Sequence, residues 1–387
     1  MNKQYVKLVM VTKDNNNKFY EMTYTGGSSF NVVYGRIEST QTKVSYPYGM
    51  WDTKYREKVK KGYKDVTELA SVEIVEQKVK PVEYVDIEDV HVAEFITVMK
   101  RYTDGLVNKV YSVKSTSVSK KQVDEAQKLL DELSNLAKSK KKDVTLINTR
   151  LVELYMVIPR YIKDVRREIL PHIDLEKVLS QEQDNLDAMA LQVNINKKSE
   201  EVKESKTPKK LSILDQLGVT LNKINSSAEV DKYVKQISGM KVKSIFQVDK
   251  PRENQVFENW VKNQKNKDTT VVIHGTRCTS VIPILEQGLK IRPSGNFQFS
   301  GKVYGNGNYF SEDWNTSRHY TGNDTDKVLL VYEVHVGKPS YNSASNYSEI
   351  QRMGYDSFAM KGQGGLHTMR VMYKEEQSRI KYIIWLK

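Results

Sequence analysis

The chain has 387 residues, of which 39% are hydrophobic and 28% charged, so it is long enough for two or three domains with separate cores. Its net charge of +13 favours polyanionic partners, although a solvated surface that keeps the protein soluble gives the same surplus. The single cysteine, Cys278, excludes an intramolecular disulfide and argues against thiolate zinc sites, and therefore against a zinc-finger DNA reader.

Other features of the composition concern the compartment. Low cysteine usage indicates a reducing, intracellular location: the nucleus in a eukaryotic cell, otherwise the cytoplasm. No apolar run approaches the roughly 18 residues that cross a membrane, and the first residues do not have the pattern of a signal peptide. We therefore expect no membrane partner.

Residues 1–80 alternate in the way strands do. Runs rich in β-branched and aromatic residues cover Tyr5–Thr12, Phe19–Thr25 and Phe30–Ile37, and Asn- and Gly-rich turns separate them. A strongly charged segment, Trp51–Lys61, then has helical character. These residues predict a small β-rich domain.

Residues 85–195 change to a helical period. Ser119-Lys-Lys-Gln122 is a capping box, and apolar residues follow it at helical spacing: Val123, Ala126, Leu129, Leu130, Leu133 and Leu136. Further helices are predicted over 146–158, where Pro159 ends the helix, and over 175–193. Residues 196–210 contain almost nothing to bury and predict a solvated linker.

Residues 211–387 return to short, β-branched runs around one short helix, Thr279–Gln287. The predicted strands cover 241–248, 269–273, 328–336, 370–373 and 381–386. The fold class is therefore multidomain α+β, with a small β-rich domain, an all-helical domain, a linker and a second β-rich domain.

Three ordered motifs in the last domain carry candidate chemistry. A strand delivers His274-Gly275-Thr276-Arg277, a glycine-rich loop precedes Tyr309, and Ser317-Arg-His-Tyr320 follows. Each motif alone also has a purely structural explanation. A lone histidine more often has a structural role than a binding role, and a tyrosine after glycines is in the core about as often as it is in a binding site. Together they could hold a flat aromatic amide, with stacked rings, a glycine backbone pairing with the carboxamide, and a hydroxyl completing the recognition.

The same motifs resemble the diphtheria-toxin-like ADP-ribosyltransferase domain of poly(ADP-ribose) polymerases, and the closing segments from Tyr355 resemble its last strands. The resemblance covers most of 211–387 and implies NAD+ as substrate, without a metal. It implies that His274 binds the adenosine-side ribose, Gly275 and Ser317 hold the carboxamide, Tyr320 stacks on the nicotinamide, and Tyr309 supports it from the other side.

One position departs from the family. The resemblance implies that polymerising members carry a glutamate four residues before a tyrosine, and counting back from Tyr373 that position is Met369. A thioether cannot give this anionic support, whose loss costs about ten- to hundredfold in rate. We therefore expect transfer of single ADP-ribose units to protein or nucleic acid ends. A catalytically dead transferase fold on a DNA-end-binding interaction protein is the alternative. Glu375 and Glu376 are weaker candidates for the missing carboxylate.

The first two domains resemble the family's other modules. Val33-Tyr34-Gly-Arg36-Ile37 is similar to a WGR domain, with Tyr34 where the naming tryptophan stands, and implies binding of DNA ends or nicks. Tyr34 would stack on a terminal base and Arg36 would pair with a terminal phosphate, unless both belong to an ordinary hairpin. The helical stretch resembles the family's autoinhibitory regulatory domain, with Asp187 as the residue that gates NAD+ entry.

Overall fold

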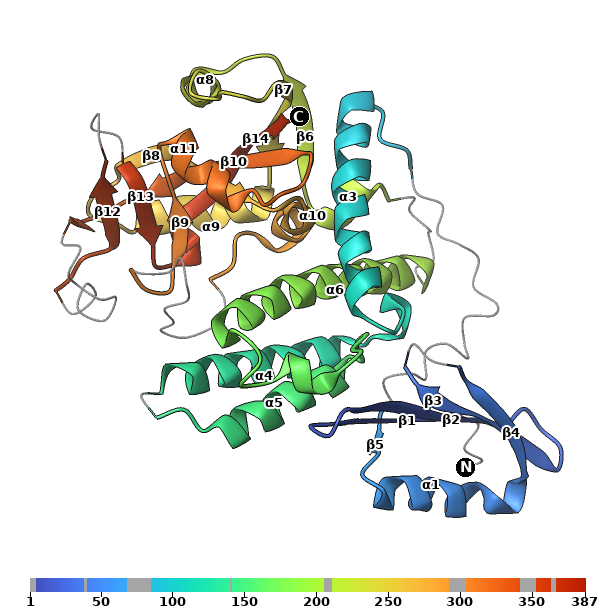
Figure 1. Cartoon of the computed structure of the whole chain (residues 1–387). Coiled ribbons are helices and arrows are strands. Elements are labelled where there is room, and N and C mark those ends of the chain that lie inside the picture. The colour runs from blue at the N-terminus through green and yellow to red at the C-terminus, as the bar shows by residue number, and fades with distance from the viewer. Residues whose placement is uncertain are drawn as a thin grey trace. The chain divides into compact units, whose positions relative to one another are not determined.

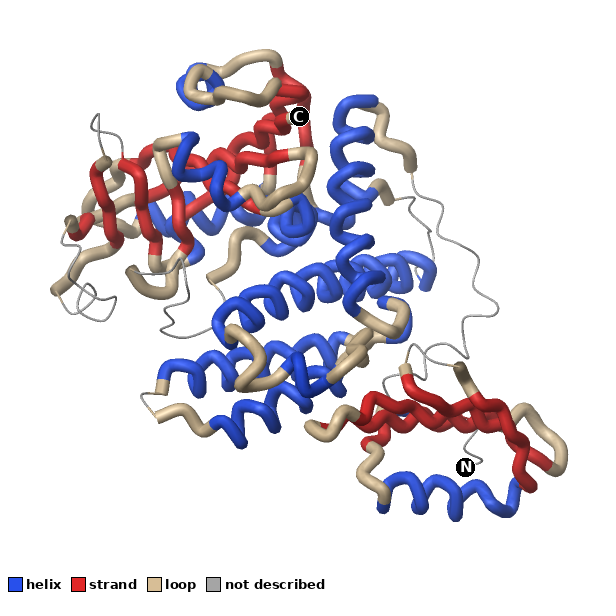
Figure 2. The backbone as a smooth tube through the Cα atoms, viewed as in Figure 1, coloured by secondary structure: helices blue, strands red, loops and turns tan. Residues whose placement is uncertain are grey.

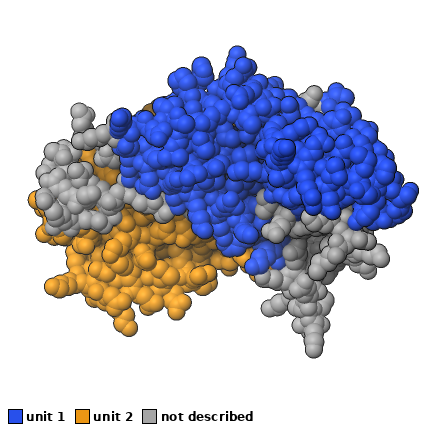
Figure 3. Space-filling view, turned by 90° about the horizontal axis from the view of Figure 1, so that it is seen from below, with its two compact units in different colours: residues 1–81, 106–197 blue, residues 82–105, 198–387 orange. Residues whose placement is uncertain are grey.

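A computed structural model describes residues 5–37, 40–67, 85–139, 141–204, 211–291, 304–341, 353–362 and 367–387. The chain divides into two compact units, which Figure 3 colours separately. Unit 1 comprises Met1–Pro81 and Leu106–Lys197, and unit 2 comprises Val82–Gly105 and Lys198–Lys387. Unit 1 therefore combines the segment predicted as the β-rich domain with most of the segment predicted as the helical domain, and residues 82–105 group with the C-terminal strands. The layout of separate β-rich, helical and linker segments stays a prediction.

Unit 1 begins with a five-stranded sheet of order β4-β3-β2-β1-β5, visible in Figures 1 and 2. Its elements are β1 (Tyr5–Thr12), β2 (Asn16–Thr23), β3 (Ser29–Arg36), β4 (Thr42–Pro47), α1 (Trp51–Lys60) and β5 (Lys64–Asp65). Alternate residues of β1, β2 and β3, such as Leu8, Met22 and Phe30, are buried with Trp51 of α1. The predicted strands and the predicted helix are thus present, because their period-2 pattern gives one face to bury.

The helical part of unit 1 contains α4 (Lys120–Lys138), α5 (Val144–Val157) and α6 (Leu175–Glu204), the last of which passes into unit 2 after Lys197. α4 begins at the predicted capping box, in which Ser119 accepts from the Gln122 backbone and Gln122 accepts in return. α6 continues to Glu204, so the first nine residues of the predicted linker 196–210 are helical, and the remaining six lie outside the described residues. This Lys- and Glu-rich stretch has one apolar residue, Val202, but lysine and glutamate are good helix formers, and their helix propensity accounts for the last turns.

The described residues of unit 2 form two sheets. The larger has the order β6-β7-β14-β10-β8 and the smaller β11-β12-β13-β9. The strands are β6 (Thr220–Ile224), β7 (Val242–Asp249), β8 (Thr269–Thr276), β9 (Asn308–Phe310), β10 (Lys327–His335), β11 (Pro339–Ser340), β12 (Ser357–Lys361), β13 (His367–Met372) and β14 (Ser378–Leu386). Its helices are α7 (Ile213–Leu217), α8 (Ala228–Val234), α9 (Pro251–Lys262), α10 (Cys278–Gln287) and α11 (Trp314–Ser317).

The central strands β10 and β14 of the larger sheet are buried on both faces over Val328–Tyr332 and Tyr382–Leu386, which explains why these runs are apolar. Residues 90–105 of one further helix, α3 (Val90–Val110), belong to unit 2, where Phe95 contacts Phe246 and Trp385 with ring centroids 5.0 and 5.4 Å apart. Tyr102 on this helix donates a 3.1 Å hydrogen bond to Asp326.

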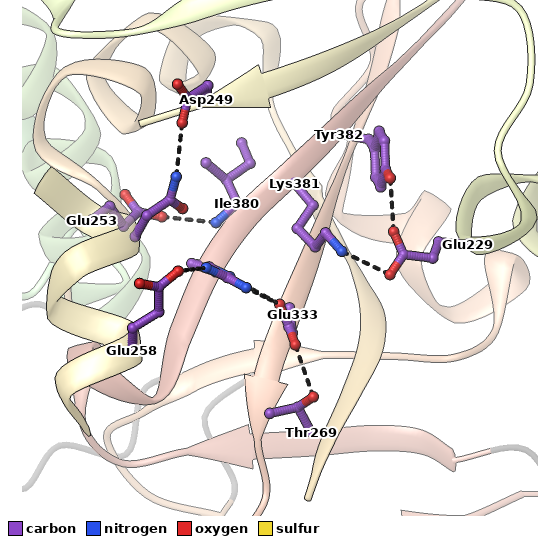
Figure 4. A network of polar contacts seen from close by, with 11 residues as sticks. Glu229, Asp249, Glu253, Glu258, Thr269, Glu333, Ile380, Lys381 and Tyr382 are labelled. Atoms are coloured by element: carbon purple, nitrogen blue, oxygen red, sulfur yellow. Dashed lines mark hydrogen bonds and ion pairs between the residues drawn. The ribbon is translucent and has the colours of Figure 1, made fainter. Parts of the chain in front are cut away.

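Polar contacts fix α9 and α8 to β14, as Figure 4 shows. Glu253 of α9 accepts from the Ile380 backbone at 2.8 Å, and Glu229 of α8 accepts from Lys381 and Tyr382, each at 2.7 Å. Arg379 lies between Glu333 and Glu258 at 2.8 Å from each. These contacts hold the outer helices against the sheet whose far edge, β8, carries the candidate site.

Candidate active site

The two sheets of unit 2 meet at the strand that carries the first motif. Ile273 of β8 and Ser311, just after β9, exchange both backbone hydrogen bonds, at 2.8 and 2.9 Å. This bridge joins the edge of the larger sheet to the edge of the smaller one. A small pocket of about 40 Å³ opens beside it and is lined by residues of both sheets and of α11.

The pocket collects the predicted site residues from distant parts of the chain. Its lining is Ile273, His274, Gly275, Tyr309, Phe310, Ser311, Thr316, Ser317, Tyr320, Thr368 and Met369. All six positions assigned from the resemblance to NAD+ binding or to catalysis are therefore neighbours. No carboxylate and no lysine or arginine is among the lining residues that the structure describes.

His274 is fixed and kept neutral by its surroundings. Its Nδ1 lies 2.8 Å from the backbone oxygen of Tyr309, and because a carbonyl only accepts, Nδ1 carries the proton. Burial lowers the pKa of the His274 imidazole from its ordinary value of 6.5. The imidazole makes edge-to-face contacts with the rings of Phe310 and Tyr332, whose centroids lie 5.9 and 6.4 Å from its own. The unprotonated Nε2 is then a hydrogen-bond acceptor, suited to a hydroxyl.

Gly275 is required by close packing. A Cβ at this position would lie 2.9 Å from the backbone carbonyl carbon of Ser317 and closer still to its oxygen. Its backbone groups also have a defined direction. Alternate residues of an antiparallel strand direct both polar groups to the same side, and Ile273 directs both at Ser311. Gly275, two residues on, therefore directs its N–H and C=O away from β10, on the side of the pocket.

The glycine-rich loop before β9 is a tight loop, as predicted. A Cβ on Gly307 would lie 2.6 Å from a Val371 methyl, so only glycine lets the loop pack on β13. The Tyr309 hydroxyl donates to the Gly305 carbonyl at 2.7 Å and accepts from the Tyr304 backbone at 3.1 Å. The hydroxyl thus closes its own loop, and burial raises the pKa of Tyr309 above its ordinary value. What remains for a ligand is the ring.

Ser317 and Tyr320 come from the short helical segment after β9. Asp313 caps α11 by accepting from the backbones of Asn315 and Thr316 at 3.2 and 2.9 Å, which orients the segment. Ser317 is buried, whereas Tyr320 is 48% exposed. A tyrosine that exposes half its surface beside a pocket has a free ring face for stacking.

Met369 lies on β13, where it pairs across the strand with Met360. The neighbouring Arg370 is bound to Glu312 at 2.8 Å, an ion pair that sequence reasoning missed and that holds β13 against the segment after β9. Glu375 does not line the pocket, because it accepts from Lys290 and from the Ile291 backbone at 2.7 and 2.9 Å. Glu376 is also absent from the lining.

The remaining predicted site residues belong to unit 1. The Arg36 guanidinium donates to the Asn15 backbone and side chain at 2.7 and 2.8 Å, and to the Lys163 carbonyl at 2.6 Å. Tyr34 packs against Tyr20 with centroids 5.7 Å apart, and the Lys58 ammonium lies 5.7 Å from its ring. Both residues therefore have internal partners, as in the ordinary-hairpin reading, and their contact with DNA stays a prediction.

Asp187 is half-buried on α6 and accepts a 3.1 Å hydrogen bond from Gln183, which in turn pairs with Gln127 of α4 at 2.9 Å. It therefore takes part in the packing of α6 on α4. Its gating role stays a prediction. The described residues contain no group of three or more His, Cys, Asp or Glu side chains arranged to hold a metal ion. None of the helices in the described ranges is long and apolar enough to cross a membrane.

Comparison with known proteins supports the assignment of the pocket to an ADP-ribosyltransferase domain. Residues 221–367 match the family model of the poly(ADP-ribose) polymerase catalytic domain, a match that ends two residues before Met369. Invertebrate iridescent virus 6 has two relatives. Its uncharacterized protein 101L is 46% identical over 192 residues, 50% of this chain and 79% of that protein. Its poly(ADP-ribose) polymerase-like protein 100L is 45% identical over 167 residues, 40% of this chain and 92% of that protein.

A cellular relative is more distant. Chicken poly(ADP-ribose) polymerase 1 is 28% identical over 126 residues, which are 32% of this chain and 12% of that protein. The match to the catalytic-domain model and the coverage of the viral polymerase-like relative agree with the pocket at the junction of the sheets. The chain therefore belongs to the poly(ADP-ribose) polymerase family and carries its NAD+-dependent ADP-ribosyltransferase domain.

Proposed function

We propose that this protein transfers single ADP-ribose units from NAD+ and that DNA ends or nicks stimulate the transfer. The observation that carries the proposal is the convergence of His274, Gly275, Ser317 and Tyr320 on one pocket whose wall at Met369 lacks a carboxylate. These four residues would bind NAD+, whereas the anion expected of a polymerising enzyme is absent from the described lining.

Each group has a role that its geometry supports. The backbone N–H and C=O of Gly275 can pair with the carboxamide of nicotinamide, and the Ser317 hydroxyl adds a third contact. The rings of Tyr309 and Tyr320 provide stacking surfaces for the pyridinium. The Nε2 atom of His274 can accept from a hydroxyl of the adenosine-side ribose. NAD+ would thus be held at both ends while its glycosidic bond breaks.

Bond cleavage develops positive charge on the nicotinamide-side ribose. Without a nearby anion, stabilisation of that charge depends on π faces and on neutral dipoles, so turnover is expected to be slow. Chain growth also needs an ADP-ribose acceptor to be oriented at the same position, which a thioether does not do. Transfer of one unit to a protein or to a nucleic acid end is the reaction that remains.

The positive charge of the chain supports the proposal that DNA stimulates the transfer. The chain has a net charge of +13, and α1 exposes Arg56 and Lys60 on its outer side. Lys54 and Lys58 of the same helix instead lie over tyrosine rings of the sheet, at 4.6 and 4.3 Å from the centroids of Tyr46 and Tyr20. Phosphate contact is therefore proposed for the outer side of α1.

The test is release of nicotinamide from labelled NAD+ by the full chain, without DNA, with nicked duplex and with intact circular DNA. We expect slow release that nicked duplex stimulates, and single ADP-ribose units on the acceptor. Tyr320→Ala, which removes an exposed pocket ring without touching the core, is the matched control and should abolish release. If NAD+ binds but no DNA produces release, the protein is a DNA-end-binding interaction protein with an inactive transferase fold.

A further inference from the structure

Thr368 lines the pocket, although none of the three sequence motifs includes it. β12 and β13 pair regularly from Ser357↔Met372 to Met360↔Met369, but Lys361 then pairs with His367. Thr368 is therefore an extra residue on β13, a β-bulge. In a regular strand, neighbouring side chains point to opposite faces, and only one of Thr368 and Met369 would face the pocket. The bulge explains why both line it.

The strand opposite makes room for this side chain. A Cβ on Gly362 would lie 3.5 Å from the Thr368 hydroxyl oxygen and would overlap its γ-methyl. A residue larger than glycine would push the Thr368 side chain aside. The bulge and the glycine together determine where this hydroxyl lies, next to Met369.

Most other hydroxyls of the lining are used by the fold itself. The Tyr309 hydroxyl bonds to Gly305 and Tyr304, the Ser311 hydroxyl to Asp313, and the Thr316 hydroxyl to the Asp313 carboxylate at 2.7 Å. Three side-chain hydroxyls have no hydrogen-bond partner among the described residues, those of Ser317, Tyr320 and Thr368. The Ser317 hydroxyl already has a role in the proposed binding of nicotinamide, and Tyr320 is assigned to stacking through its ring.

We propose that Thr368 is a substrate-positioning residue whose hydroxyl hydrogen-bonds the nicotinamide-side ribose of NAD+. The inference rests on the proposed function, and it deepens it by naming the polar group that the bulged strand directs to the sugar. A threonine hydroxyl both donates and accepts, so it can hold a ribose hydroxyl in place without a charge. It orients the sugar beside Met369 but adds no anionic stabilisation.

The test compares Thr368→Val with Thr368→Ser in the full chain. Valine keeps the β-branched shape that packs on Gly362 and removes only the hydroxyl, whereas serine keeps the hydroxyl. Binding of NAD+, ADP-ribose and nicotinamide is measured by calorimetry, and thermal unfolding is measured alongside. We expect Thr368→Val to weaken binding of NAD+ and ADP-ribose by about threefold to tenfold, the effect of one neutral hydrogen bond, and to leave nicotinamide binding unchanged. Thr368→Ser should restore most of the affinity.

The outcomes separate this inference from the function on which it rests. If the unmodified chain binds neither NAD+ nor nicotinamide, the proposed function fails. If it binds both but Thr368→Val binds NAD+ as tightly as before, the ribose contact is refuted while the function stands. Equal weakening of nicotinamide and NAD+ would also refute it, because it would show that the substitution deforms the whole pocket.

Discussion

Replacing Met369 with glutamate tests most directly why the turnover of NAD+ in this pocket is expected to be slow. The Met369 side chain is half-buried in the pocket wall and faces Met360 across the strand pair. A carboxylate there would meet the developing positive charge of the ribose with a charge-assisted hydrogen bond, about 1.5–3 kcal/mol in strength. If all of it were expressed in the transition state, turnover would rise about 10- to 150-fold.

The structure places the expected gain at the lower end of that range. The described residues lining the pocket include no lysine or arginine, so the new carboxylate would be partly desolvated without a cation. Its pKa would rise above that of an exposed glutamate, and part of the interaction energy would offset that cost. We therefore expect Met369→Glu to raise kcat for nicotinamide release by about tenfold. The gain should be present above the raised pKa and should be lost as the pH falls through it.

The assay measures nicotinamide release at saturating NAD+ across pH, together with the length of the ADP-ribose product. Met369→Gln is the matched control, because it has the same shape and hydrogen-bonding reach without charge. It should give a clearly smaller increase than the glutamate variant. If Met369→Glu folds, binds NAD+ as the unmodified chain does and turns over no faster, β13 does not present this residue to the reacting sugar. The reasoning would then be wrong.

Three further predictions concern other parts of the chain. Gly275→Ala should lower NAD+ affinity by more than about tenfold and lower the Tm, because the alanine methyl would collide with the Ser317 backbone. An unchanged Kd by calorimetry together with an unchanged Tm would contradict this. Because burial lowers the pKa of His274, NAD+ affinity should stay constant as the pH falls from 8 through 6.5. The free energy of unfolding should begin to fall near pH 6.5, because the histidine of the unfolded chain takes up its proton there first. A Kd that changes with an inflection at pH 6.5 or above would argue against a neutral, buried ring. Arg36→Gln removes both the charge and the fork that bonds Asn15 and the Lys163 carbonyl, so the free energy of unfolding should fall by about 1–3 kcal/mol. The salt dependence of DNA binding should stay the same, and a salt slope reduced by about one would instead support the phosphate contact.

The sequence by itself determined the elements whose patterns are local. The strand β1 occupies Tyr5–Thr12 as predicted, and α4 begins at the predicted capping box, because alternation and capping are decided by residues within a few positions of one another. The motif order around His274, Tyr309 and Ser317 pointed to the pocket because each residue lies in a short run with its own recognisable spacing. The extension of α6 to Glu204 was missed, since it depends on propensity without an apolar pattern.

Tertiary structure alone decided the polar geometry of the pocket. The direction of the Gly275 backbone follows from the bridge between Ile273 and Ser311, which lie far apart in sequence and on different sheets. Thr368 lines the pocket only because β13 has one residue more than β12 opposite it, and a bulge has no signature in either strand taken singly. The internal bonds of Arg36 likewise required Lys163 to be brought to it by folding. Contacts between distant segments depend on register and packing, and those are properties of the folded chain as a whole.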